Sequence, residues 1–497
     1  MIYAHSLGHA ARLFPDRAAL WSGDRWPTFA ELDHRVVRIA GALSRHGFAS
    51  GDRLAVLMPN GADYLELVYA CAWLGVIVVP LNVRLSVVEL DRILADARPR
   101  GLIRHSSLPV PTVPLAWQLV LDQEALDLGD DGSRSAPIND PDAVLGLIYT
   151  SGTTGHPKGV VVTHANILAN VVHFDYWMPN KDGAVHLHAA PLFHIADFPV
   201  MFAAPAFGGA QVTIPRFTPQ DFCQTVEHAR VSHTVLVPTM INLLTQFPEL
   251  EKYDLASLEE IAYGGSPMAP ELIRRTREVL PGVRLVQGYG LSETGFLTAL
   301  RDDEHVGRRL TSCGRPAPGI EVRVVDGSGA VVKAGEAGEL IARGANVMRG
   351  YWKSPKETAQ AFLDGWFRTG DIGYQDADGF FYILDRLKDM IVTGGENVYS
   401  GEVEAVIYEH PAVRDAAVLG IPDPKWGELV AACVVLKPGM ALSGDELIDH
   451  CRGSLANYQV PRRVEFSNTE LPKNGTGKIL KRVLRERFWG HQEHTVS

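Results

Sequence analysis

Segment 149–160 constrains this chain most, because it joins an apolar run to a loop of small and hydroxylated residues. Its sequence is YTSGTTGHPKGV. The apolar residues 144–149 predict a buried strand that delivers the loop to one end of a sheet. The glycines let the backbone approach a ligand closely, and backbone N–H groups and hydroxyls of such a loop can surround phosphate oxygens. With Lys158 to neutralise charge, the segment predicts a phosphate-binding loop.

This loop differs from the phosphate loop of P-loop NTPases. That motif needs Gly-Lys followed directly by Ser or Thr, whereas Lys158 precedes Gly159. The pair Gly477-Lys478 is followed by Ile479. The P-loop NTPases are therefore excluded, and an ordinary surface turn is the alternative for a loop of this composition.

Composition and charge limit the classes of partner. The formal net charge of -11 argues against nucleic acid. The five cysteines form no CxxC pair, which favours free thiols in a reducing cytoplasm over disulfides or a zinc site. No apolar run reaches the roughly 18–20 residues of a membrane-spanning helix. We therefore expect a cytoplasmic enzyme without a transmembrane segment.

Helical and strand patterns alternate along the first 300 or so residues. Capping boxes at 28–31 and 86–89 predict helix starts, and 53–58 and 76–79 read as strands. This alternation predicts an α/β fold with parallel sheets covered on both faces.

Three later strands are expected at 235–239, 261–266 and 284–287, and each ends in small residues. Open α/β sheets bind ligands at the carboxyl ends of their strands. We therefore expect one crevice at this edge.

The pattern changes after about residue 310, where short strands at 321–325, 338–342 and 380–384 are separated by Gly and Pro turns. They predict a small β-rich subdomain. Residues 391–497 have their own strands and helices and the length of a domain. We predict an N-terminal core at 1–386 and a smaller C-terminal α+β cap at 387–497.

Four charged residues lie in or beside glycine-containing segments where chemistry could occur. Glu293 offers a hard oxygen ligand for Mg²⁺. Asp371 directly follows Gly370, Arg386 lies in the charged segment 385–389, and Lys478 follows Gly477 in a glycine-containing loop near the C-terminus. Alone, each has an ordinary alternative: a solvated glutamate or lysine, an Asx turn, or a surface ion pair that contributes about 0–1 kcal/mol.

Taken in chain order, these motifs resemble the adenylate-forming superfamily, which contains acyl-CoA synthetases, adenylation domains of peptide synthetases and luciferases. The resemblance runs from about residue 25 to 488. Its motifs are the phosphate loop (150–159), the adenine-binding turn (264–266), the Tyr-Gly-x-Ser/Thr-Glu block (289–293), the ribose aspartate Asp371, the hinge block (385–389), the Gly-Gly-Glu-Asn block (394–397) and Lys478.

The resemblance implies a role for each matched residue. Tyr289 would stack on adenine, Ser292 would contact the α-phosphate, and Glu293 would hold Mg²⁺. Asp371 and Arg386 would hold the ribose. The other nucleotide contacts implied are Thr150, Ser151, Gly152, Thr153, Thr154, Gly155, Lys158, Gly264, Gly265, Ser266, Gln287, Gly288 and Gly290.

The resemblance also implies two reaction steps. Lys478 would bridge the carboxylate and α-phosphate during adenylation, with Glu293 and His194 as further catalytic residues. The cap would then rotate about Lys388, so that the CoA-facing block with Gly394, Gly395 and Glu396 meets the core for thiol attack. Two departures from relatives, Ser400-Gly401 in place of Pro-Ala or Pro-Ser and Gln459 in place of lysine, concern cap packing and CoA affinity.

These features predict an ATP-dependent, AMP-forming acid–CoA ligase that uses Mg²⁺. Its substrate would be a medium- or long-chain fatty acid or an aryl-propenoic acid. By analogy, His194, Phe198, Pro238 and Phe296 line an apolar acid pocket. The alternatives are an adenylating enzyme that serves a carrier protein or an oxidative step, and a ligand-binding relative without catalysis. The one macromolecular partner that we expect is a second copy of this chain, with which it would form a homodimer.

Overall fold

The computed structural model describes residues 3–489 apart from 22, 24, 124–136, 151–156, 180–182 and 474–478. It consists of two compact units. The first unit comprises Met1–Val322 and Ala342–Phe367, and the second comprises Arg323–Ile341 and Arg368–Ser497. The hinge at Lys388 and the boundary at 386/387 remain predictions.

The first unit contains a seven-stranded mixed sheet in the order β16-β6-β5-β2-β1-β3-β4. Strands β5, β2, β1, β3 and β4 run parallel, whereas β6 is antiparallel to β5 and β16 to β6. The predicted parallel sheet is confirmed, and the antiparallel strands β6 and β16 extend it at one edge. The strands are β1 (Arg53–Leu57), β2 (Ile77–Pro80), β3 (Gly101–Arg104), β4 (Trp117–Val120), β5 (Val144–Thr150), β6 (Lys158–Thr163) and β16 (Gly350–Tyr351).

A second seven-stranded sheet has the order β13-β12-β11-β10-β9-β7-β8. Its strands β8, β7, β9, β10 and β11 run parallel, and β12 and β13 add antiparallel pairs. The strands are β7 (Val185–His188), β8 (Ala210–Thr213), β9 (His233–Leu236), β10 (Glu260–Gly264), β11 (Arg284–Leu291), β12 (Gly295–Leu300) and β13 (Arg315–Pro316).

The helices of the first unit begin largely where the sequence predicts. Both capping boxes form, with Thr28 before α2 and Ser86 before α4. The α-helices are α1 (Tyr3–Leu13), α2 (Phe29–Arg45), α3 (Ala62–Leu74), α4 (Val87–Ala97), α5 (His164–Trp177), α6 (Val200–Ala206), α7 (Pro219–Ala229), α8 (Pro238–Thr245), α9 (Pro270–Val279) and α10 (Pro355–Gln360). Short 3-10 helices are η1 (Leu250–Lys252), η2 (Asp302–Glu304) and η3 (Gly307–Thr311).

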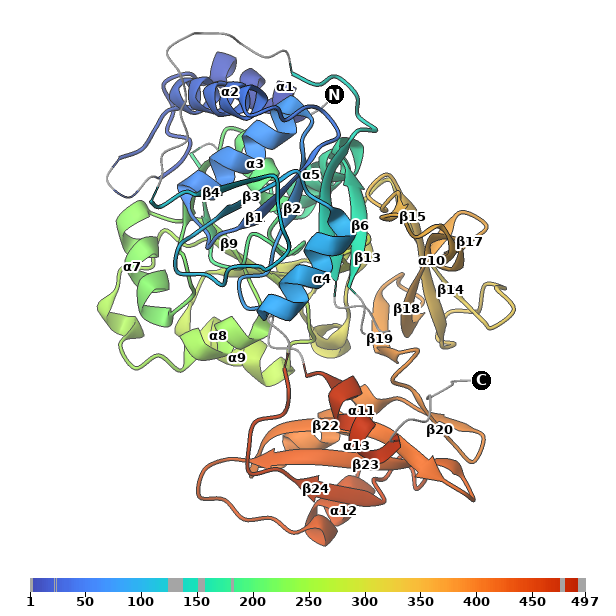
Figure 1. Ribbon diagram of the computed structural model, residues 1–497. Helices are drawn as coiled ribbons and strands as arrows, with labels where there is room; N and C mark the ends of the chain where they lie inside the picture. Colours follow the sequence, from blue (N-terminus) through green and yellow to red (C-terminus); the bar gives the residue numbers. More distant parts are fainter. Residues whose placement is uncertain are drawn as a thin grey trace. The chain divides into compact units, whose positions relative to one another are not determined.

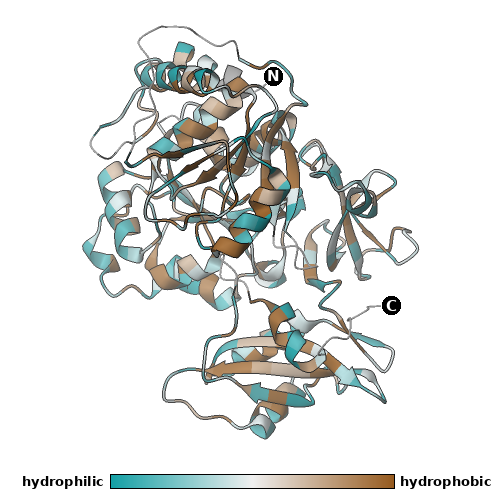
Figure 2. Ribbon diagram, viewed as in Figure 1, coloured by the Kyte–Doolittle hydropathy of each residue, from teal (hydrophilic) through white to brown (hydrophobic). Residues whose placement is uncertain are grey.

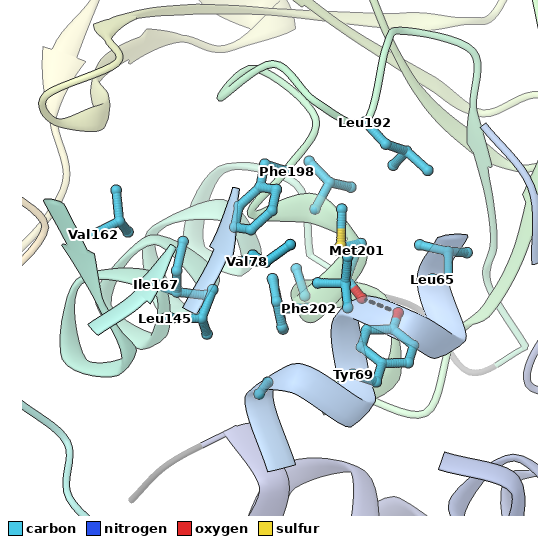
Figure 3. Close-up of a cluster of buried hydrophobic side chains, with 14 of the residues drawn as sticks. Leu65, Tyr69, Val78, Leu145, Val162, Ile167, Leu192, Phe198, Met201 and Phe202 are labelled. Carbon is cyan, nitrogen blue, oxygen red and sulfur yellow. Dashed lines mark hydrogen bonds between the residues drawn. The ribbon is translucent and has the colours of Figure 1, made fainter. Parts of the chain in front are cut away.

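Apolar residues of helices and strands form several hydrophobic clusters, and the largest of them lies in the first unit. Hydropathy colouring places brown residues on the central strands and teal residues on outer helices such as α2 and α7 (Figure 2). Within the largest cluster, Leu65 and Tyr69 of α3 lie beside Met201 and Phe202 of α6 (Figure 3). The Tyr69 hydroxyl donates to the carbonyl of Met201 at 2.5 Å, so the polar end of this buried ring is paired.

Two smaller sheets complete the fold. In the first of them, strands β14, β15 and β18 cross the sequence boundaries of the second unit, and β17 lies within residues 342–367 of the first unit. This sheet has the order β14-β15-β18-β17, with β19 on β18. Its strands are β14 (Ile320–Val325), β15 (Gly338–Gly344), β17 (Phe362–Leu363), β18 (Trp366–Gln375) and β19 (Phe381–Arg386). The predicted strands 321–325, 338–342 and 380–384 are confirmed, whereas β18 was not predicted.

The last sheet has the order β21-β20-β23-β22, with β24 on β23. Its elements are β20 (Ile391–Thr393), β21 (Glu396–Val398), α11 (Ser400–Glu409), β22 (Val413–Asp423), β23 (Gly427–Leu436), α12 (Gly444–Arg452), β24 (Arg463–Phe466) and α13 (Lys481–Trp489), all visible in orange and red in Figure 1. Ala416 and Val418 of β22 pack with α11 and α12, whereas Ala417 and Leu419 pack with Leu484 of α13. Because side chains alternate across a strand, the helices cover opposite faces.

Among the described residues, no helix has the length and apolarity that crossing a membrane requires.

Candidate active site

The strands on either side of the predicted phosphate loop form a β-hairpin. Strands β5 and β6 pair with Thr150 opposite Lys158, so the predicted strand before the loop is confirmed and a second strand follows it. The Tyr149 hydroxyl donates to Asp96 at 2.5 Å. The predicted contacts Ser151, Gly152, Thr153, Thr154 and Gly155 lie outside the described residues.

Lys158 and Glu293 are joined through a tyrosine that the sequence did not reveal. Lys158 Nζ lies 5.1 Å from the ring centroid of Tyr351. The Tyr351 hydroxyl donates to Glu293 Oε1 at 2.8 Å. Burial, and then the charge of Glu293, raises the pKa of Tyr351, so its hydroxyl remains a donor. Lys158, which is predicted to bind phosphate, and Glu293, which is predicted to hold Mg²⁺, thus lie around one ring.

Strand pairing explains how Tyr351 reaches this position. Tyr351 belongs to β16, which pairs antiparallel with β6 so that Tyr351 lies opposite Val160. The backbone N–H of Met348 donates to the carbonyl of Glu293 at 2.7 Å. A strand of only two residues, Gly350–Tyr351, gives a weak signal in the sequence. The Gly-Tyr-Trp run at 350–352 was the one feature that could have pointed to Tyr351.

The carboxyl ends of β9, β10 and β11 meet at one edge, as predicted. Leu236 pairs beside Tyr263, and Gly264 lies beside Gly288. A side chain at Gly264 would collide with the Gly288 carbonyl, so glycine is required for this close approach. Gly265 continues with a φ of 77° and leads to Ser266. Pro238 is the first residue of α8 and is separated from the end of β9 by Val237 alone.

Residues 288–291 form strand rather than the expected turn. Strand β11 continues to Leu291 and pairs with β12, and the register shifts between Tyr289 and Gly290. The earlier assignment of the strand end at Gln287 is therefore wrong. The Thr294 hydroxyl accepts from the Leu291 N–H at 3.1 Å and closes the turn. Gln287 and Tyr289 of β11, and Ser292 in the turn that follows it, are all half-buried.

Phe296 lies over Gly288. A Cβ at Gly288 would come within 2.7 Å of the Phe296 ring, so only glycine leaves room for it. Asn170 of α5 holds the backbone of Phe296, accepting its N–H at 2.9 Å, and the Phe174 ring lies 5.9 Å away. This pair of aromatic rings is consistent with the prediction that Phe296 lines an apolar acid pocket.

His194 and Phe198 occupy the same loop in different environments. Burial lowers the pKa of His194 to about 4, so the ring is neutral at pH 7. Its Nδ1 accepts from the Ala196 N–H at 3.2 Å, which leaves the proton on Nε2. Phe198 is fully buried and packs against Phe202, with 5.5 Å between centroids (Figure 3). The structure thus gives Phe198 a core position.

Asp197, between these residues, belongs to a buried network. Its Oδ1 lies 3.0 Å from His188 Nδ1, and both side chains are buried. An aspartate committed to an α-amine would mark an amino-acid-activating enzyme. The His188 contact supports a local structural role instead.

In the second unit, Asp371 and Arg386 lie opposite each other on β18 and β19. Asp371 is 2% exposed, and Arg386 Nε lies 2.6 Å from its Oδ1. The two predicted ribose-binding residues are therefore brought together by strand register. Lys388 lies in the exposed turn that follows β19.

The predicted CoA-facing block forms a tight hairpin between β20 and β21. Gly394 and Gly395 have φ of 60° and 88°, which a two-residue turn with both central residues left-handed requires. The Gly394 N–H donates to the Trp426 carbonyl at 2.8 Å. Trp426 is 47% exposed beside Gly394, and Glu396 begins the returning strand. Lys478 lies outside the described residues.

Comparisons with known proteins agree with this arrangement. The AMP-binding enzyme family matches residues 7–352, and the AMP-binding enzyme C-terminal domain matches residues 402–478. Feruloyl-CoA synthase of an Amycolatopsis species is 41% identical over 482 residues, 96% of this chain and 97% of that protein. A long-chain-fatty-acid–CoA ligase of Mycobacterium tuberculosis is 36% identical, covering 93% of each.

A solved structure extends the similarity to three dimensions. The o-succinylbenzoate CoA synthetase of Bacillus subtilis, in complex with its acyl-adenylate intermediate, matches with a TM-score of 0.87 and 34% identity over 97% of both chains. The two family matches include the phosphate loop, Glu293, Tyr351 and Lys478, and the relatives named above align over more than nine-tenths of the chain. The chain therefore belongs to the AMP-binding enzyme family.

Proposed function

We propose that this enzyme joins a hydrophobic carboxylic acid to coenzyme A in two steps. In the first, the acid's carboxylate oxygen attacks the α-phosphorus of ATP and expels pyrophosphate. In the second, the CoA thiol attacks the acyl carbonyl and expels AMP. The observation that carries the proposal is the grouping of Lys158, Tyr351 and Glu293 in a chain that matches the family along its length.

Each predicted site residue has a physical task in the first step. Two anions must approach each other, so fixed cations and donors lower the barrier. Lys158 would neutralise phosphate charge, and Asp371 would accept from ribose hydroxyls while Arg386 holds its carboxylate. The neutral His194 would offer its Nε2–H to the acid without adding charge. Lys478 would bridge the reacting oxygens.

Mg²⁺ bound with ATP would neutralise part of the triphosphate charge. The ion is bound through one or two carboxylates together with substrate phosphates. Glu293 fits this requirement, since its half-buried carboxylate is oriented by the Tyr351 hydroxyl. Glu293 would hold the ion from the protein side.

The acid is proposed to be an aryl-propenoic or medium-chain fatty acid. The aromatic wall of Phe174 and Phe296 stands beside the glycine edge and suits a flat apolar tail. The feruloyl-CoA synthase relative supports the aryl-propenoic class, and the fatty-acid ligase supports the alternative.

A panel of acids tests this assignment. Pyrophosphate release with ATP should be fastest for cinnamic-type or medium-chain acids and at least about tenfold slower for acetate, because acetate buries no tail. Acyl-CoA should accumulate only when CoA is present. Strict preference for acetate would contradict the apolar pocket. Transfer to a phosphopantetheinylated carrier protein but not to CoA would support the carrier-protein alternative.

Tyr351→Phe tests the link between Lys158 and Glu293. The variant removes only the hydroxyl that orients Glu293, so we expect a rise of about three- to tenfold in the concentration of MgATP giving half-maximal rate, the effect of one hydrogen bond to a charged group. Thermal stability should change little, because the ring remains. Tyr176→Phe, which alters an exposed tyrosine on α5, is the matched control. Equal effects in both variants would contradict the role of Tyr351.

We also propose that the enzyme works in the cytoplasm and forms a homodimer. All five cysteines are free and buried, which suits a reducing cytoplasm. The homodimer remains a prediction that sedimentation analysis can test.

A further inference from the structure

A buried charge cluster in the second unit lies between the ribose pair and the segment that carries Lys478. Lys481, the first residue of α13, places its Nζ 2.7 Å from Glu404 Oε1 and 2.5 Å from Ser400 Oγ. The Ser400 N–H donates to Asp385 Oδ2 at 2.5 Å. Ser400 itself is fully buried. One serine thus contacts both the end of β19 and the start of α13.

On one side, this serine reaches the ribose pair. Asp385 Oδ1 accepts the backbone N–H of Arg386 at 2.7 Å, and Arg386 pairs with Asp371. Any shift of the Asp385 carboxylate would therefore move the backbone that carries Arg386.

On the other side, Ser400 reaches the segment just after Lys478. The two flanks of residues 474–478 are joined by a bridge between Lys473 and Ile479. Lys473 Nζ lies 2.5 Å from Asp415 Oδ2. Lys481 anchors the second flank by its contacts with Ser400 and Glu404. The base of the lysine segment is therefore fixed by two buried or half-buried ion pairs.

A second pair on α13 reinforces this attachment. Arg485, one turn after Lys481, places its Nη2 2.9 Å from Asp389 Oδ1, and both side chains are 12% exposed. Helix α13 is thereby held to α11 by Lys481 and, one turn later, to Asp389 by Arg485.

We propose that Ser400 is a positioning residue that couples the ribose-binding pair to the base of the Lys478 segment. It does so with two hydrogen bonds, one from its backbone N–H and one to its hydroxyl, that a proline at this position has no atoms to make. The inference rests on the proposed role of Lys478 in adenylation. It assigns Ser400 to the first step of the reaction and not to the second.

Two variants test the coupling in the full-length enzyme. Ser400→Ala removes the hydroxyl acceptor of Lys481 and keeps the N–H. Ser400→Pro removes both. Proline is tolerated at the first position of a helix, and Tyr399 already has the extended backbone that precedes proline, so the variant should fold.

We expect Ser400→Ala to slow adenylation about tenfold, the effect of losing one hydrogen bond from a charged donor, and Ser400→Pro to slow it further. Thioester formation from supplied acyl-adenylate should stay within about twofold of wild type, since Lys478 serves only the first step. Ser443→Ala, which removes a serine cap from α12 in the same unit, is the matched control for general destabilisation. Its two partial rates should change equally.

Hydrogen exchange provides a readout that does not depend on Lys478. In Ser400→Ala, peptides covering 385–389 and 479–489 should both exchange faster, while Ser443→Ala leaves them unchanged. Unchanged exchange, or equal slowing of both partial reactions, would overturn the proposal. If Lys478→Ala spares adenylation, the proposed function of Lys478 fails, and the exchange result still decides whether Ser400 couples the two segments.

Discussion

Lys478→Ala is expected to slow acyl-adenylate formation by about 10²–10³-fold, the usual cost of removing one group that stabilises developing charge in a transition state. The lysine is assigned to the moment when the carboxylate oxygen and the α-phosphate share negative charge. Binding of ATP and of the acid should be much less affected, because Lys158, Glu293 and the Asp371–Arg386 pair remain. The loss should therefore appear mainly in kcat.

The second half-reaction separates this role from a structural one. With acyl-adenylate and CoA supplied, Lys478→Ala should form the thioester at a rate near that of wild type. Lys437→Ala is the matched control, because Lys437 is a lysine of the same unit whose Nζ donates only to the carbonyl of Pro411 among its described contacts. Equal loss of both half-reactions in Lys478→Ala would refute its assignment to adenylation.

The order of motifs predicted more of this site than the local patterns did. Asp371 alone read as an Asx-turn residue, and Arg386 alone as a surface ion-pair residue. Pairing of β18 with β19 makes them neighbours, and such register between distant segments has no local signature. Only the resemblance to a family placed them together beforehand.

The errors have physical causes. Glycines depress strand propensity, so residues 288–291 read as a turn until β12 supplied the pairing that extends β11. Strand β6 was not predicted because its first residues, Lys158 and Gly159, were assigned to the phosphate-binding loop. Tyr351 was missed because a two-residue strand has too few residues to show periodicity. By contrast, capping boxes rely on hydrogen bonds within a few residues, and both predicted boxes form.

Buried histidines should make the enzyme acid-sensitive, an effect that the sequence did not suggest. Burial lowers the pKa of His164 and of His194 to about 4 in each case, and nearby Asp140 offsets only part of the effect at His164. His164 is 1% exposed, and neither ring nitrogen has a hydrogen-bond partner among the described residues. Burial also lowers the pKa of His186 well below its usual value. These rings fold in the neutral form.

The sign of the pH dependence follows from this. An unfolded histidine binds a proton near pH 6.5, whereas these folded rings do so only near pH 4 or lower. Between these values the unfolded chain binds more protons, so stability falls as the pH falls. His188 acts in the opposite direction. Burial lowers its pKa, but Asp197 and the hydrogen bond with Gln211 together outweigh burial, so the net pKa is raised. Because more buried histidines have a lowered pKa than a raised one, we expect a net loss of stability as the pH falls.

The free energy of unfolding should therefore decrease by several kcal/mol between pH 7 and pH 5, with a ceiling of about 2 kcal/mol from each of His164 and His194 at about 1.4 kcal/mol per pH unit. Urea unfolding at the two pH values measures the loss. His164→Leu should reduce the loss by up to that single-histidine contribution, because an apolar side chain replaces an imidazole that has no partner. A His164→Leu protein that loses as much stability as wild type between pH 7 and pH 5 would show that this ring is not kept neutral by burial.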